Sequence, residues 1–172
     1  EPNSVADYLE TLQDRTVYTG PSASFPPEPL ADWGEPLAYP VNFANRLALI
    51  GLEIPREQIF STDDGVNNQL FLRPLIHRTD EPLMIYLHLL REDGTVAAQR
   101  DLMGVLTPNW HRDTIIQQDN YIIGGVLEPG RYIVAMGLYN WQTLERYPVL
   151  DADGNTIADR VILAEINVVL RQ

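Results

Sequence analysis

The sequence predicts an all-β protein, a two-layer antiparallel β-sandwich of jelly-roll or immunoglobulin-like type with a short N-terminal helix. From residue 41 onward, about eight apolar stretches of strand length are separated by clusters of Gly, Pro, Asn and Asp. Asp-Gly pairs at 93–94 and 153–154 favour tight hairpins between antiparallel strands. Strand-like and helix-like segments do not alternate along the chain, so a nucleotide-binding α/β fold is not expected.

The first 40 residues differ in pattern from the rest, which divides the chain into a segment at 1–40 and a β-sandwich domain at 41–172. Residues 4–14 begin with a Ser4–Asp7 pair typical of a helix start and continue with apolar residues at helical spacing. Residues 19–40 are rich in proline and small residues, a composition that favours an extended connector.

Three strands are expected between residues 43 and 90. Residues 43–54 are apolar on both faces, which is typical of a central strand. Residues 69–77 alternate, but Pro74 cannot donate to a strand ladder, so this strand is expected at a sheet edge or at a bulge. One face of the strand expected at 82–90 carries Ile85, Leu87 and Leu89.

The second half of the chain continues in strands. The turn at Asp93-Gly94 leads into a partner for the strand at 82–90, a weaker strand follows at 113–124, and a clear one occupies 131–139. The strand at 131–139 is predicted to form a three-strand meander with two further strands, expected at 143–149 and 160–170. The inward side chains of 160–170 are expected to be Ile162, Ala164, Ile166, Val168 and Leu170.

The stretch LEPGRY at 127–132 predicts a corner between strands. Pro129-Gly130 favours a type II turn, because proline fixes φ near about −65° and glycine accepts a positive φ. Tyr132 enters the next strand, a pattern that is common where immunoglobulin-like sandwiches turn a corner.

Composition excludes several classes of function. The net charge of −12 repels phosphate groups, so nucleic acids and anionic membrane surfaces are not expected partners. All twelve basic residues other than histidine are arginine, and the absence of lysine rules out a Schiff-base lysine and a P-loop. The absence of cysteine rules out a thiol nucleophile and cysteine metal sites.

Residue types and spacings give no catalytic or cofactor motif, and no cofactor is expected. His77, His88 and His111 lie too far apart in sequence to form a local metal-ligand pair. Serine occurs at positions 4, 22, 24 and 61, none of them in a nucleophile-elbow setting. Carboxylates are plentiful, so a glycoside-processing enzyme based on two paired acids stays open as an alternative.

The stretch DADGNTIAD at 151–159 has the residue types of a calcium loop without its spacing. Glycine falls at the fourth position and Ile162 at the twelfth, where an EF-hand needs glycine at the sixth and glutamate at the twelfth. A simple turn between strands is therefore preferred here. A sandwich-type calcium site built from Asp151, Asp153 and Asp159 stays as a weaker alternative.

Two tryptophans in expected loops, Trp110 and Trp141, have two interpretations. Such a side chain can stack on a sugar ring or grip a partner, because it offers a flat apolar area at little entropic cost. Large aromatic residues are also mostly buried, which favours a lid over the sandwich core. Tyr139 and Arg146 are expected to face each other across the hairpin around Trp141. The candidate binding residues are therefore Trp141, Tyr139, Trp110 and Arg146.

The order of these motifs resembles a known family. From VNFANRLALIGLEI to the strand pair LMIYLHLLREDGTVAAQRD and on to LEPGRYIVAMGLYNWQTLERYPVLDADG, the chain is similar to the extracytoplasmic C-terminal β-sandwich of some bacterial protein-mannosyltransferase-like membrane glycosyltransferases. The resemblance covers roughly residues 41–170 and departs from the family pattern at Pro74 and Pro148. The matching positions are Gly51, Asp93, Gly94, Gln99, Asp101, Pro129, Gly130, Tyr132, Gly137, Tyr139, Thr143, Glu145, Arg146, Asp151 and Gly154.

The resemblance implies a non-catalytic accessory module of a membrane-associated or cell-envelope protein, located outside the cytoplasm and contacting a glycan or a protein partner. The family's sugar-transfer chemistry belongs to its membrane-embedded part, so no catalytic residue carries over and the chain itself is not expected to be an enzyme. Contact with a membrane is expected only through segments outside this sequence. A free-standing carbohydrate-binding module is the first alternative.

Overall fold

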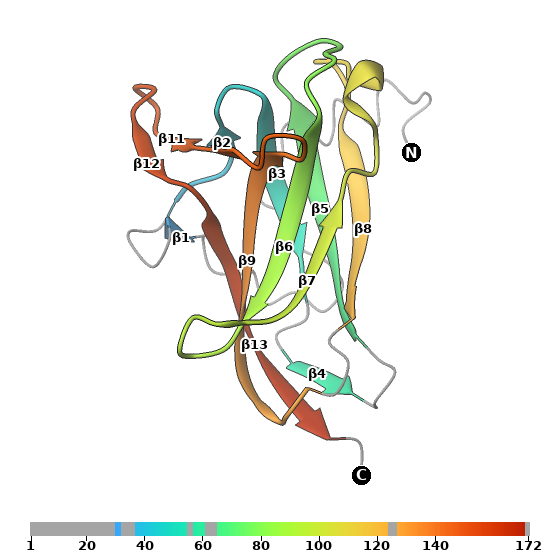
Figure 1. The fold of residues 1–172 in the computed structure, drawn as a ribbon, viewed down its shortest axis with the longest axis vertical. Coiled ribbons are helices and arrows are strands. Elements are labelled where there is room, and N and C mark those ends of the chain that lie inside the picture. The colour runs from blue at the N-terminus through green and yellow to red at the C-terminus, as the bar shows by residue number, and fades with distance from the viewer. Residues whose placement is uncertain (1–29, 32–36, 55–56, 61–64, 124–126, 171–172) are drawn as a thin grey trace, which may run out of the picture.

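The chain forms two antiparallel sheets that pack face to face, which confirms the predicted β-sandwich (Figure 1). The computed structural model describes residues 30–31, 37–54, 57–60, 65–123 and 127–170. The helix predicted at 4–14 and most of the connector predicted at 19–40 lie outside the described residues. In the described part of the chain, no helix is both long enough and apolar enough to span a bilayer.

The first sheet has the strand order β1-β13-β9-β6-β7. A short strand, β10, also pairs with β9, and β4 runs parallel to the end of β13. The bounds are Leu30–Ala31 (β1), Glu57–Phe60 (β4), Leu83–Leu90 (β6), Val96–Leu102 (β7), Gly130–Asn140 (β9), Arg146–Tyr147 (β10) and Val161–Leu170 (β13).

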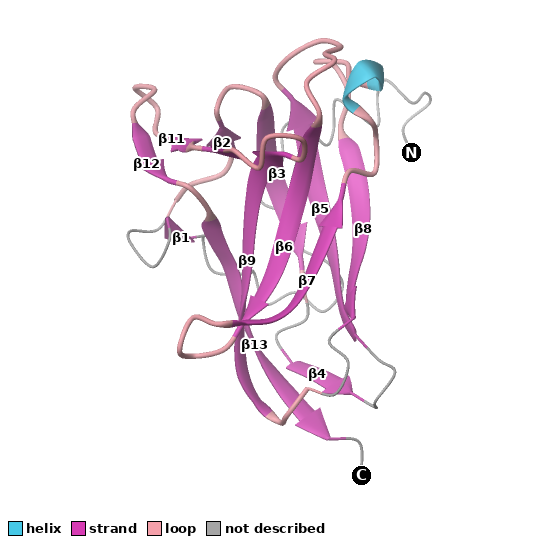
Figure 2. Ribbon diagram, in the orientation of Figure 1, coloured by secondary structure: helices cyan, strands magenta, loops and turns pink. Residues whose placement is uncertain are grey.

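The second sheet has the strand order β12-β11-β2-β3-β5-β8. A single 3₁₀ turn, η1 (Thr107–Asn109), lies in the connection from the first sheet to the last strand of this one (Figure 2). The bounds are Val41–Phe43 (β2), Leu47–Glu53 (β3), Gly65–Pro74 (β5), Ile116–Ile123 (β8), Val149–Leu150 (β11) and Thr156–Ala158 (β12).

The core lies between the sheets and is built from alternate residues of each strand. In β6, Ile85, Leu87 and Leu89 all belong to it, as the alternation predicts. The central strand β9 is buried on both faces from Tyr132 to Leu138. A second, small apolar cluster therefore lies on the outer face of the first sheet and consists of Leu90, Ile133, Ala135 and Ile162.

The prediction of a single strand at 43–54 is wrong, because the chain turns back at residues 44–46 between β2 and β3. Ala44 and Asn45 adopt positive φ values of 50° and 56°, which end β2 and let β3 pair with it. The Asn42 side chain accepts a hydrogen bond from the Asn45 backbone at 2.8 Å and stabilises this reversal. The apolar residues on both sides of the turn hide it in the sequence pattern.

Of the two alternatives predicted for the strand at 69–77, the edge position is wrong, and the irregular pairing with β3 lies between Leu49 and Gly51 rather than at Pro74. β5 lies between β3 and β8, and Pro74 is its last residue. At the end of the strand the missing N–H does not interrupt the ladder, and the next backbone N–H, from Leu75, donates to Arg46.

The predicted meander is wrong as well, because the chain changes sheet at Pro148. β10 pairs with β9 in the first sheet, whereas β11 pairs with β2 in the second. Pro148 cannot donate a ladder hydrogen bond, which suits it to the point of crossing. The Asp153-Gly154 turn therefore joins β11 to β12 rather than to β13.

Of the residues predicted to point inward from the last strand, the three central ones are confirmed. Ala164, Ile166 and Val168 belong to the core, but a bulge between Ile162 and Ala164 moves Ile162 to the outer face. A bulge adds one residue to a strand and reverses the alternation beyond it. The side chain of Leu170, the last of the predicted set, lies outside the part of the chain that the structure describes.

The corner predicted at LEPGRY is present, although its turn differs. The Tyr132 hydroxyl donates to the Glu128 carbonyl at 2.9 Å, as in the tyrosine corner of immunoglobulin-like sandwiches. Gly130 has a φ of 156°, far from the value of about +80° that a type II turn requires, and it begins β9 directly.

Candidate functional site

Six side chains on the outer face of the first sheet form an aromatic and ionic group, which we call the outer-face cluster. Tyr86 on β6 stands opposite Asp101 on β7 and Gly137 on β9, and Tyr139 stands opposite Arg146. The register predicted for Tyr139 and Arg146 is thus confirmed. The cluster consists of Tyr86, His88, Asp101, Tyr139, Arg146 and Asp159.

Tyr86 is the centre of the outer-face cluster. Its ring lies 4.6 Å from the His88 ring and 6.0 Å from the Tyr139 ring, measured between centroids. The Arg146 guanidinium carbon lies 5.1 Å from its centroid, within cation–π range. Only 3% of Tyr86 is exposed, so its neighbours already cover the ring.

The polar groups of the cluster are bonded to one another. Tyr139 donates its hydroxyl hydrogen to Asp101 at 2.8 Å, and Arg146 donates to Asp159 at 2.9 Å. The Tyr86 hydroxyl donates to the Asp159 carbonyl at 3.3 Å. These contacts hold β10 and the residues before β13 against the sheet. Tyr139 and Arg146, predicted as ligand-binding residues, therefore support the fold at this place.

Burial and ionic neighbours shift two pKa values in the cluster. Partial burial raises the pKa of Tyr139 to about 12, and the Asp101 carboxylate adds to this shift by accepting the hydroxyl hydrogen. Burial lowers the pKa of His88. The positive charges of Arg146 and Arg160 lower it further, whereas the negative charge of Asp101 acts in the opposite direction. His88 is therefore held in its neutral form near pH 7.

Replacing Asp101 by asparagine is expected to lower the pKa of Tyr139. A tyrosine whose folded pKa exceeds the ordinary value near 10 contributes stability that is fully present below pH 10 and lost as the pH rises toward 12. In Asp101→Asn this loss still begins near pH 10 but ends at a lower pH, because the folded pKa of Tyr139 is lower. The measurement is the ultraviolet titration of tyrosinate, with Tyr139→Phe subtracted to isolate the one residue. An unchanged titration in Asp101→Asn would contradict the assigned cause.

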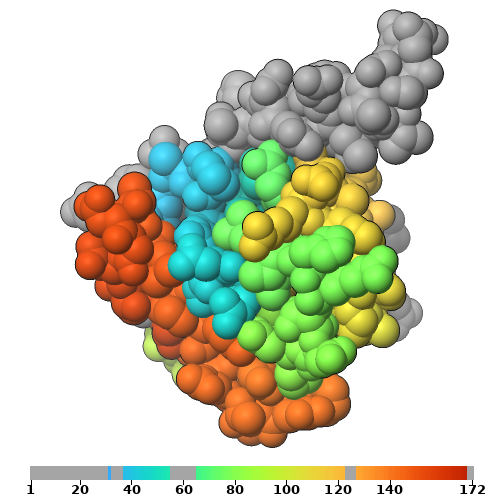
Figure 3. Space-filling model, turned by 90° about the horizontal axis from the view of Figure 1, so that it is seen from above, coloured from blue at the N-terminus to red at the C-terminus, as the bar shows by residue number. Residues whose placement is uncertain are grey.

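The loops at one end of the sandwich form a second candidate region, which we call the loop end. It contains the β2–β3 turn, the β5–β6 loop, the segment around η1 and the β9–β10 turn, which lie close together at the top of Figure 2. Seen from above, differently coloured segments of the chain form one continuous surface there (Figure 3). Segments distant in sequence thus share one face.

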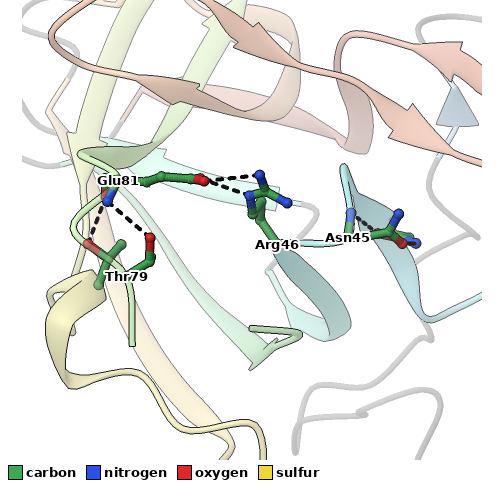
Figure 4. Close-up of polar contacts among 6 residues, drawn as sticks. Asn45, Arg46, Thr79 and Glu81 are labelled. Atoms are coloured by element: carbon green, nitrogen blue, oxygen red, sulfur yellow. Dashed lines mark hydrogen bonds and ion pairs between the residues drawn. The ribbon is translucent and has the colours of Figure 1, made fainter. Parts of the chain in front are cut away.

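Polar contacts fix the loops of the loop end to one another. Arg46 binds both carboxylate oxygens of Glu81, at 2.8 and 3.0 Å, and joins the β2–β3 turn to the β5–β6 loop (Figure 4). Glu81 also receives a hydrogen bond from Thr107 on its carbonyl oxygen, at 2.8 Å, and its own N–H donates to Thr79. A bidentate pair restrains both partners more than a single contact does.

Trp110 is a lid over the core and is not available to a ligand, so its predicted role in stacking is wrong. Its side chain is fully buried, and its indole N–H donates to the Val105 carbonyl at 2.8 Å. Its own carbonyl accepts from the Arg78 backbone at 3.1 Å. The indole thus closes the sandwich end while its one polar atom is satisfied.

Trp141 is exposed, as its interpretation as a binding residue requires and its interpretation as a lid does not. It is 50% exposed, and Leu144 on the same turn is 72% exposed. The turn is rigid: the Asn140 side chain accepts from the N–H groups of Gln142 and Thr143, and the Trp141 N–H donates to the Pro82 carbonyl at 2.9 Å. We call residues 141–145 the tryptophan turn.

Leu144 has a φ of 62°, a left-handed conformation that glycine and asparagine adopt more easily. Leu144→Asn is therefore expected to leave the free energy of unfolding unchanged or to raise it by up to about 1 kcal/mol. Chemical denaturation of both proteins measures this. A loss of stability on replacement would show that Leu144 packs against the fold in spite of its exposure.

Two of the three aspartates of the weaker calcium alternative, Asp151 and Asp159, are engaged in other contacts. Asp151 accepts hydrogen bonds from the backbone of Asp153 and Asn155, at 2.9 and 2.8 Å, and so closes the β11–β12 turn. Asp159 pairs with Arg146. Over the described ranges no group of three or more His, Asp or Glu side chains could hold a metal ion.

The structure brings two of the histidines together. His77 and His111 lie edge to face with ring centroids 4.7 Å apart, at the loop end, while His88 belongs to the outer-face cluster. The residues are far apart in sequence, and only the folding of the β5–β6 loop beside η1 makes them neighbours. Sequence spacing therefore held no signal for this pair.

Two surface cavities are lined mainly by residues that no sequence motif marks. One, of about 510 Å³, is mostly apolar and lies between residues 37–42 and the β11–β12 hairpin. It includes Tyr39, whose buried hydroxyl has no hydrogen-bond partner. The other, of about 330 Å³, is polar and lies on the second sheet; it is lined by Glu53, Asn67, Asn68, Gln69, Asp119 and Asn120.

No protein-family model matches this chain, and a search of curated proteins finds no significant match.

Proposed function

We propose that this chain is a non-catalytic accessory β-sandwich module of a membrane-associated or cell-envelope protein, and that it contacts a glycan or a protein partner through the tryptophan turn. The exposed pair of Trp141 and Leu144 on a rigid turn is the observation that carries the proposal. The resemblance of its motif order to that of extracytoplasmic domains of bacterial membrane glycosyltransferases is the argument for the cellular setting.

The tryptophan turn presents apolar side chains on an ordered backbone. An exposed apolar pair has unfavourable contact with water, and a left-handed leucine adds backbone strain of about 1–2 kcal/mol, so the hydrogen bonds of the turn hold these two side chains where they do not themselves stabilise the isolated domain. A partner that covers the pair removes the apolar surface from water. Because the turn is already ordered by Asn140 and Pro82, binding loses little further conformational entropy.

Site-specific photo-crosslinking in the native cell envelope tests the proposal. A benzophenone amino acid at position 141 is expected to form a defined adduct with a glycan or a protein. The same group at position 157 is the matched control, because Ile157 is also exposed but lies on β12, away from the tryptophan turn. Equal labelling at both positions, or none at position 141, would count against the proposal.

Binding of purified protein gives the second arm. A glycan array followed by calorimetric titration should show that Trp141→Ala and Leu144→Asn both weaken binding of any glycan that the wild-type domain holds, by about tenfold or more for the tryptophan. Ile157→Ala is expected to bind as the wild type does. Wild-type binding that survives both replacements would place the contact elsewhere on the domain.

A free-standing carbohydrate-binding module using Trp141, Tyr139 and Trp110 as one platform has less support. Trp110 is buried under the loop end, and the Tyr139 hydroxyl is bonded to Asp101. Of the three aromatic residues, Trp141 alone presents a large exposed face.

A further inference from the structure

The polar cavity on the outer face of the second sheet is formed by a row of side chains that crosses three strands. Glu53 on β3 stands opposite Gln69 on β5, and Gln69 stands opposite Asp119 on β8. Directly opposed side chains in antiparallel strands have Cβ atoms about 5 Å apart. The three side chains therefore lie next to one another along one line.

A second row lies one step along the strands. Asn67 on β5 stands opposite Tyr121 on β8. Their neighbours Val66 and Ile122 are core residues, so alternation directs Asn67 and Tyr121 to the same outer face as the first row. Asn68 and Asn120, which also border the cavity, are buried and belong to an inner amide network with Gln118.

The cavity offers both hydrogen-bond donors and acceptors. Glu53 and Asp119 contribute carboxylates, and Asn67 and Gln69 contribute amides that donate and accept. The Gln69 amide donates to one oxygen of Asp119 and so fixes the orientation of that carboxylate. The second oxygen of Asp119 stays available as an acceptor.

Tyr121 stands opposite Asn67, outside the cavity lining, and adds an aromatic surface on the same outer face. It is 36% exposed, and its ring lies against Gly65, where an added Cβ would come within 3.0 Å of the ring carbon Cζ. A ring supported in this way at a sheet surface offers apolar area at little entropic cost.

The mixture of groups selects among ligand classes. An ammonium group only donates and would leave the amide N–H groups of Asn67 without an acceptor, whereas the Gln69 amide already donates to Asp119. Over the residues that the structure describes, no group of three or more acids and histidines is suited to a metal ion. Hydroxyl groups both donate and accept, and a ring carrying several of them also has an apolar C–H face for an aromatic side chain.

We propose that this cavity, with Tyr121 beside it, binds a neutral sugar residue. Asp119 and Glu53 accept hydrogen bonds from adjacent hydroxyl groups, Asn67 and Gln69 complete the polar contacts, and Tyr121 covers the C–H face. Its volume of about 330 Å³ is at the small end of ligand sites and suits one sugar ring. The tryptophan turn is at the opposite end of β3 and β5, so this site is separate from the contact proposed above.

Calorimetric titration and saturation-transfer NMR with methyl glycosides of glucose, mannose, galactose and N-acetylglucosamine test the proposal. One of them is expected to bind with a dissociation constant below about 10 mM, the range of single-sugar sites that rely on few contacts. Asp119→Asn is expected to weaken binding of that glycoside about tenfold, because a hydrogen bond to a charged acceptor is stronger than one to a neutral acceptor. Tyr121→Ala is expected to weaken binding and Tyr121→Phe to preserve it.

Two control variants distinguish binding in this cavity from binding elsewhere on the domain. Asp113→Asn removes an exposed carboxylate at the loop end and should leave sugar binding unchanged, as should Trp141→Ala. Thermal melting of each variant checks that it is folded. No binding by any of the four glycosides, full binding by folded Asp119→Asn, or tighter binding of ethylammonium than of sugars would overturn the proposal. Crosslinking at position 141 would be unaffected by any of these results.

Discussion

Replacing Gly137 by alanine is expected to destabilise the domain by about 3 kcal/mol or more, at the upper end of the usual effect of overpacking. An added Cβ would come within 2.2 Å of both Cζ and the hydroxyl oxygen of Tyr86. Tyr86 cannot move aside easily, because Arg146, Tyr139 and His88 surround its ring. Urea denaturation of the wild type and the variant measures the difference in the free energy of unfolding.

A second replacement identifies the cause of that loss. In a Tyr86→Ala background the space above residue 137 is empty, so Gly137→Ala should cost less than about 1 kcal/mol there. The difference between the two backgrounds is the coupling energy of the pair. If the alanine costs the same in both backgrounds, the loss arises from the backbone of β9 and not from contact with Tyr86.

The general architecture could be predicted because local patterns determine it. Alternation in β6, the Asp93-Gly94 hairpin and the Tyr132 corner all depend on residues close in sequence, and the structure confirms each of them. The paired position of Tyr139 and Arg146 follows from the same local reasoning.

The errors arose where the apolar pattern does not mark a change in path. The turn at 44–46 has apolar residues on both sides, and the bulge before Ala164 reverses the alternation without any glycine to mark it. Pro74 and Pro148 both signal interrupted pairing. One ends an interior strand and the other marks a crossing between sheets, and only the tertiary arrangement separates these outcomes.

The candidate sites were harder to predict than the fold. Trp110 and Trp141 both occur in loops with similar residues, so local sequence does not reveal which of them is buried. Glu53, Gln69 and Asp119 come from three strands, and their neighbourhood depends on the pairing of β5 with both β3 and β8. Without strand order, residues of such a row cannot be recognised as a group.

Trp110→Ala is expected to have the other large effect, a loss of about 3–5 kcal/mol in the free energy of unfolding. Trp110 is fully buried over the core, and its removal leaves a large cavity and a Val105 carbonyl without its indole donor. The free energy of unfolding of Trp110→Phe should lie between those of the wild type and Trp110→Ala. Phenylalanine refills most of the space but cannot donate to the Val105 carbonyl, and that hydrogen bond contributes about 1 kcal/mol.

Trp141→Ala is the matched control for this experiment, since it removes the same side chain from an exposed position. Its expected effect on stability lies within about 0.5 kcal/mol, because half of the indole already contacts water and the turn is held by backbone groups and Asn140. Chemical denaturation of the two alanine variants therefore separates a structural tryptophan from one available for binding. A comparable loss in both would mean that Trp141 also serves the fold, and the case for a partner at the tryptophan turn would fail with it.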